Sequence, residues 1–73
     1  QAASLGRIGE KMERALAALD QADAGGRPDA LKAAADACWC FFVQREVMGL
    51  RDRAAVIAQY RIPREVLNRI GAR

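Results

Sequence analysis

Seven consecutive apolar residues, Ala37 to Val43, form the feature that most constrains the fold of this chain. An α-helix turns about 100° per residue, so seven successive positions go nearly twice around its axis. A helix with one face in water carries a single apolar stripe instead. The run is also much shorter than the ~18 residues of a membrane-spanning helix. It therefore predicts a central helix that is contacted from more than one side, and no membrane span.

The residues around this run set the limits of the central helix, which we expect at about 29–48. Two glycines at Gly25-Gly26 and the proline at Pro28 indicate a turn before it. Asp29 is the expected N-cap; alternatively Arg27 is the cap and Pro28 is the first helical residue. Gly49 suits the left-handed position that ends a helix, and Leu50 is then expected to fold back onto the last turn.

A first amphipathic helix is predicted at about 4–23. Ser4 is its expected N-cap, and apolar residues then recur at steps of three and four: Leu5, Ile8, Met12, Leu16 and Leu19. Gly6 and Gly9 each lower helix stability by about 1 kcal/mol relative to alanine, so we expect fraying of the first turns. The alternative is that the two glycines let another helix approach closely.

Two short helices complete the chain, at about 53–60 and 63–70. Asp52 is a suitable cap for the first of them, and Pro63 is the expected first residue of the second. β-branched residues are few and nothing alternates for long, so no strand is predicted. The expected fold is all-α: one domain, 1–73, of two long antiparallel helices and a C-terminal pair that resembles a helix-turn-helix.

The apolar residues of the central helix divide into two sets. One set forms a stripe that the first helix is expected to cover: Leu31, Ala34, Cys38, Phe41 and Phe42. The second set lies outside this stripe and comprises Trp39, Cys40 and Val43. An exposed tryptophan beside Val43 would form a hydrophobic surface patch that favours association. We therefore predict a homodimer through this helix, with these three residues at the interface. The alternative is that the other helices enclose the central one within a single chain.

Residue types that support catalysis are scarce. The chain has no histidine, no threonine and one serine, and its carboxylate pairs, such as Glu10 and Glu13, lie on a hydrophilic helix face. Cys38 and Cys40 lie about 200° apart around a helix, so they cannot bond to each other or share a metal ion there. We expect two buried free thiols, which favour a reducing, cytoplasmic compartment. No enzyme activity, cofactor, metal or small-molecule substrate is predicted.

Positive charge is concentrated in the second half of the sequence. Residues 1–36 contain five cations and six acids, whereas residues 37–73 contain seven arginines and three acids. If the two short helices form a DNA-binding helix-turn-helix, the outward residues would be Arg61, Arg64, Asn68 and Arg69. The pattern departs from that motif, since Ile57 stands where a small alanine is usual and Arg61 where glycine is usual. The alternative is a solvated arginine-rich surface.

Arg45 directly follows the apolar run and is expected to hold a carboxylate, Asp52 or Glu65, and so to fix the C-terminal pair. A functional anion site at Arg45 is the alternative interpretation.

The segment from Trp39 to Ala72 resembles a family of short, uncharacterised bacterial proteins, a domain of unknown function. The resemblance is carried by Phe42-Val43-Gln44-Arg45-Glu46, Gly49-Leu50-Arg51-Asp52, Tyr60, Ile62-Pro63-Arg64-Glu65-Val66 and Gly71. It implies a bacterial, cytosolic helical protein and no activity or site. Because the sequence starts at Gln1 without methionine, we expect a trimmed chain or a piece of a longer one; the residues given show no targeting segment, and the loss of one stays open. The leading hypothesis is a protein-interaction or oligomerisation module, with a small DNA-binding regulator as the alternative.

Overall fold

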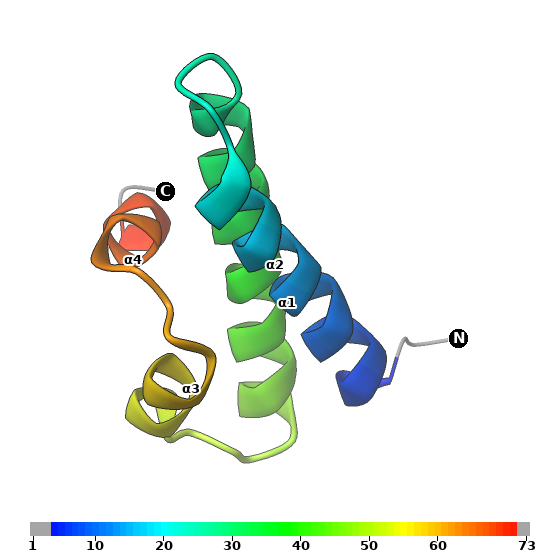
Figure 1. Cartoon of the computed structure of the whole chain (residues 1–73). Helices are drawn as coiled ribbons and strands as arrows, with labels where there is room; N and C mark the ends of the chain where they lie inside the picture. Colours follow the sequence, from blue (N-terminus) through cyan, green and yellow to red (C-terminus); the bar gives the residue numbers. More distant parts are fainter. Residues whose placement is uncertain (1–3, 72–73) are drawn as a thin grey trace.

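The computed structural model describes residues 4–71, and these form four α-helices (Figure 1). They are α1 (Leu5–Gln21), α2 (Arg27–Val47), α3 (Arg53–Tyr60) and α4 (Arg64–Gly71). Residues 4–71 contain no strand. The all-α prediction is confirmed, and each helix boundary falls within two residues of its predicted position, the usual spread for helix ends.

Helix α2 is the centre of the fold. α1 runs antiparallel to it and crosses it, while α4 packs on another side of α2 and α3 lies near its C-terminal end (Figure 1). The buried cluster takes residues from all four helices and the α3–α4 turn: Met12, Leu19, Ala34, Ala35, Ala37, Cys38, Phe41, Phe42, Val56, Ile62 and Val66. The predicted contact of α2 from more than one side is therefore confirmed.

The beginnings of the helices largely follow the predicted caps. The Ser4 hydroxyl accepts a hydrogen bond from the Arg7 N–H at 3.1 Å, and the Asp52 carboxylate accepts one from the Ala55 N–H at 3.1 Å. The start of α2 differs, because Gly26 is the N-cap and Arg27 is the first helical residue. The Asp23 carboxylate fixes this turn by accepting from the Gly26 N–H at 2.8 Å. Asp29 lies within the first turn, where its charge is favourable at the positive helix end.

Two helices end with a residue in the left-handed conformation. Gly49 has φ 84°, and the next amide, of Leu50, donates to the Arg45 carbonyl at 2.8 Å, as predicted. Arg61 has φ 54° and ψ 48°, and the Ile62 N–H donates to the Ile57 carbonyl at 3.1 Å. α4 begins at Arg64, one residue later than predicted, so Pro63 lies just before the helix. The Pro63 carbonyl accepts a hydrogen bond from the Val66 N–H.

Replacing Arg61 by glycine is expected to stabilise the domain. The left-handed conformation is unfavourable for a residue with a Cβ and nearly free for glycine, so we expect a gain of about 0.5–1 kcal/mol after the larger chain entropy of glycine is counted. Urea unfolding followed by circular dichroism measures it. The matched control, Arg64→Gly in the first turn of α4, should lose about as much. A lower stability of Arg61→Gly would contradict this explanation.

Gly9 shows which of its two predicted roles applies. It is buried inside α1, and a Cβ at this position would lie 3.2 Å from Cε1 of Phe41. The missing side chain therefore lets α1 approach the Phe41 ring of α2, which Tyr60 contacts edge-on at 5.6 Å between ring centroids. Gly6, in contrast, is exposed. The close-approach interpretation holds for Gly9, and the expected fraying does not describe it.

Candidate functional site

The C-terminal half of α2 and the turn after it carry several exposed apolar side chains, which we call the outer strip. Trp39, Val43 and Val47 are spaced four residues apart, so they lie on one face of the helix. The strip continues into the turn after α2. Its large members and their exposed fractions are Trp39 38%, Val43 37%, Val47 76%, Met48 55% and Leu50 42%; the exposed Cys40 is its sixth residue. All three predicted interface residues, Trp39, Cys40 and Val43, thus lie together on the surface of the chain.

The outer strip is limited to one half of the helix by the sequence of α2. The N-terminal half of the same face carries Lys32 and Asp36, an ion pair with 3.7 Å between Nζ and Oδ2. The opposite faces of α2 are buried beneath α1 and α4. The strip therefore starts where the polar part of the outer face ends.

The turn after α2 is held in place by polar contacts. Arg53 donates two hydrogen bonds to Oε2 of Glu46, at 2.8 and 3.1 Å, and its guanidinium lies 4.8 Å from the Phe42 ring centroid. The Leu50 amide is fixed to the Arg45 carbonyl. Because these contacts order the backbone around Met48 and Leu50, less entropy is lost when a partner covers them.

The two cysteines differ in exposure. Cys38 is buried, whereas Cys40 is exposed, so the expectation of two buried thiols is wrong for Cys40. The reason is the angle of about 200° between them, which puts Cys40 on the outer side of α2. Burial raises the pKa of the Cys38 thiol to about 11 from its ordinary 9.0.

This raised pKa predicts a loss of stability in alkaline solution. The Cys38 thiol loses its proton at a lower pH in the unfolded chain than in the folded protein. Its burial therefore contributes fully to the free energy of unfolding below about pH 9, and this contribution is lost as the pH rises to about 11. The loss is on the order of 2–3 kcal/mol. Urea unfolding at a series of pH values measures it. Cys40→Ser should keep this slope and Cys38→Ala should flatten it; equal slopes in both variants would refute the assignment.

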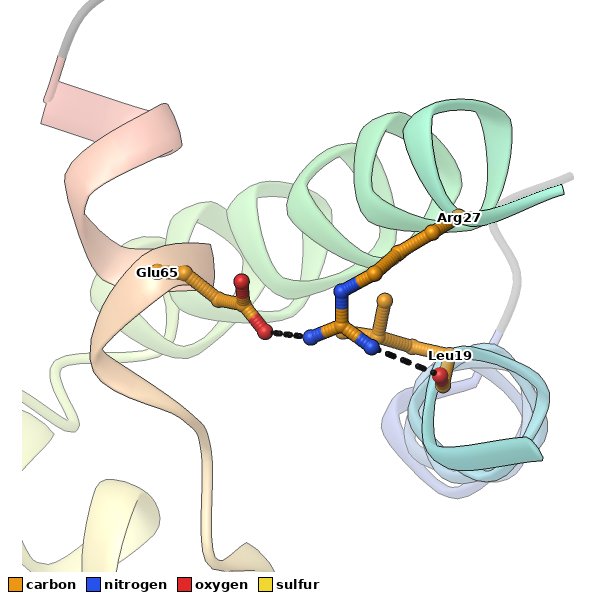
Figure 2. A network of polar contacts seen from close by, with 3 residues as sticks. All are labelled: Leu19, Arg27 and Glu65. Carbon is orange, nitrogen blue, oxygen red and sulfur yellow. Dashed lines mark hydrogen bonds and ion pairs between the residues drawn. The ribbon is translucent and has the colours of Figure 1, made fainter. Parts of the chain in front are cut away.

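Arg27, and not Arg45, pairs with Glu65, one of the two carboxylates expected for Arg45. Its guanidinium forms an ion pair with Glu65 of α4 and donates to the Leu19 carbonyl of α1 at 3.4 Å, so it links three helices (Figure 2). Arg45 holds neither Asp52 nor Glu65. Because Arg45 follows Phe41 by one turn of α2, its guanidinium instead lies 5.8 Å from the Phe41 ring centroid.

The residues of the predicted nucleic-acid surface are Arg61, Arg64, Asn68 and Arg69, and all four are exposed. α4, the expected recognition helix, packs mainly on α2, and Glu65 on it is paired with Arg27. A helix-turn-helix instead presents its recognition helix from a pair that pack on each other. Arg61 in the turn before α4 has the left-handed conformation, which glycine adopts most readily.

A groove of about 630 Å³ lies between α1 and α2. It adjoins the outer strip at Cys40, which belongs to both. Ile8, Ala33, Ala37 and Cys40 form much of its apolar lining. Its charged residues are Arg7, Lys11, Arg14 and Asp36. The sequence-based predictions do not include this site, because they considered only the net charge of residues 1–36. In that total, the three cations of the groove are cancelled by acids that lie on other faces of the helices. The spacing Arg7, Lys11, Arg14 on a helix was the signal that would have found it.

The family to which the chain belongs follows from comparison with known protein families. A family of unknown function (DUF6665) matches residues 1–73. The chain belongs to this family. The same comparisons find no significantly similar curated protein and no significantly similar solved structure.

Membership of the DUF6665 family confirms the resemblance to a domain of unknown function and extends it along the chain. The resemblance began at Trp39, whereas the family match includes α1 and the first half of α2. Both the groove and the outer strip therefore lie within the family domain; Ala72, where the resemblance ended, lies outside the described residues.

Two features are absent from residues 4–71. No helix there is long and apolar enough to cross a membrane. That same stretch contains no group of three or more cysteine, aspartate or glutamate side chains placed to hold a metal ion.

Proposed function

We propose that this protein is a non-enzymatic self-association module that forms a homodimer through the outer strip. The observation that carries the proposal is the exposure of five large apolar side chains along the C-terminal half of α2 and in its following turn. A 73-residue chain has a thin core, and burying such a surface against a second copy adds apolar contacts that the single chain lacks.

The spacing of the strip suits a two-fold symmetric contact. In a two-fold interface the same patch must meet itself. If two α2 helices cross antiparallel at Val43, then Trp39 of one copy lies opposite Val47 of the other, because both are four residues from the crossing point. The polar Lys32–Asp36 part of each helix then extends beyond the crossing, where it stays in water.

The absence of enzymatic activity and the compartment are part of the same proposal. The chain has no histidine, and among residues 4–71 the buried titratable side chain is Cys38, whose raised pKa keeps the thiol protonated and poorly nucleophilic. The free thiols of Cys38 and Cys40 favour a reducing compartment. We place the protein in a bacterial cytoplasm, as the resemblance implied.

DNA binding through α3 and α4 is the alternative made from the sequence. Its support is the exposed basic set Arg61, Arg64 and Arg69. It predicts retardation of duplex DNA at low salt with an affinity that falls steeply as salt rises. The self-association proposal predicts no such retardation, and a concentration-dependent mass instead.

Light scattering or sedimentation at micromolar concentration tests the proposal. The wild-type chain should approach twice its 8.0 kDa mass as its concentration rises. Val47→Lys puts a charge in the strip at a residue too exposed to affect folding, and it should weaken association at least about tenfold. The control Ala58→Lys adds the same charge to an exposed position of α3 and should leave association unchanged. A wild-type monomer at all concentrations would rule the proposal out.

A further inference from the structure

The groove between α1 and α2 combines an apolar lining with a segregated row of charge. At 100° per residue, Arg7, Lys11 and Arg14 lie within about 60° of one another on α1. The acids of the same helix, Glu10, Glu13 and Asp20, lie outside the groove lining. A helix with three cations and three acids therefore presents only cations to the groove.

These cations form no ion pair within the described part of the chain. The side chains of Arg7, Lys11 and Arg14 form no ion pair with any other residue of 4–71, and all three are exposed. The other wall is α2, whose Ala33 and Ala37 are one turn apart and small enough for a helix to approach closely. Asp36 adds one acid to that wall, where it is paired with Lys32.

We propose that this groove binds an acidic amphipathic helix of a partner protein. Steps of four and three residues along α1 match carboxylates spaced by four and three residues on a second helix, so three charge pairs form at once. The apolar edge of that helix would cover Ile8, Ala37 and the Cys40 side of the groove. This binding is additional to self-association and uses a different surface, with Cys40 at the border of the two.

The shape of the groove favours a helix over a single acyl chain. One carboxylate headgroup neutralises one or two cations, whereas the row extends over about two turns, ~10 Å. The groove is also open to water, so a bound acyl chain would keep much of its surface exposed. A helix brings a wide apolar face of its own and covers the opening.

The test uses two stapled helical peptides of about four turns and equal composition. Both carry leucines on one face; the matched peptide places three glutamates at steps of four and three beside them, and the other places the glutamates around the helix. Fluorescence anisotropy measures binding to the full chain. The matched peptide should bind at least about tenfold more tightly, and more weakly as salt rises from ~0.05 to ~0.5 M.

Charge-reversed variants locate the site. Arg7→Glu/Lys11→Glu/Arg14→Glu should reduce the affinity at least about tenfold, while Arg61→Glu/Arg64→Glu/Arg69→Glu, with the same change in net charge, should retain most of it. Ala33→Phe, at an exposed position of the groove, should also weaken binding without altering the circular dichroism spectrum.

Four results would overturn the inference. They are no binding of the matched peptide, equal binding of both peptides, equal loss in the two triple variants, and binding to phosphatidylglycerol vesicles, but not peptide, that depends on Arg7, Lys11 and Arg14. If the α1 triple variant instead abolishes self-association, the groove is an interface between copies and the inference also fails. Val47→Lys separates the two proposals, because it weakens association and leaves the peptide affinity unchanged.

Discussion

Replacing Phe42 by alanine should remove about 3–5 kcal/mol from the free energy of unfolding. Phe42 is among the largest fully buried side chains, within the cluster that joins all four helices, and the Arg53 guanidinium covers its ring. A domain of 73 residues has a total stability of roughly 4–11 kcal/mol, so this single change removes about a quarter or more of it. Urea unfolding followed by circular dichroism measures the loss.

Val47→Ala is the matched control for this experiment. It removes methyl groups from the same helix, but at a side chain that is 76% exposed, so we expect a change of no more than about 0.5 kcal/mol in the monomer. If Phe42→Ala costs less than about 1 kcal/mol, the described packing around α2 is wrong.

Trp39→Glu should weaken self-association and leave the fold intact, although Trp39 lies only three residues from Phe42. Trp39 is 38% exposed on the outer strip, so a glutamate there can reach water and the fold is retained. In a dimer through the strip, the change replaces a large aromatic contact by two charges related by the two-fold axis. We expect a loss of at least about 2 kcal/mol in association, which is roughly thirtyfold in affinity.

Sedimentation of Trp39→Glu together with its thermal unfolding at low concentration measures both effects. Ala58→Glu, which adds the same charge to the exposed side of α3, should change neither association nor folding. Unfolding of the Trp39 variant would show that the chain buries this residue. A folded Trp39 variant that associates like the wild type would exclude the strip as the interface.

The C-terminal α3–α4 pair shows the limit of local pattern. The caps and breaks predicted both short helices, because Asp52, Arg61 and Pro63 act on the backbone within four residues. Whether the pair reads DNA depends on how the helices pack, and α4 lies on α2. No local signal in the sequence specifies that packing.

The long-range polar contacts were also beyond the sequence. Arg27 meets Glu65 across 38 positions, and Arg45, which has the same chemistry, stacks on Phe41 instead. Which arginine reaches a distant carboxylate depends on where tertiary packing brings α4.

The sequence by itself determined the central apolar helix, its end at Gly49 and the outward direction of Trp39 and Val43, because helical periodicity and glycine C-caps act over a few residues. Only the tertiary structure decided how α1 meets α2. The absent side chain of Gly9 brings α1 onto the Phe41 ring, and this packing places the cations of α1 beside the alanines of α2 as one groove. A charge total along the chain cannot show such a groove, because it depends on which faces of two helices turn toward each other.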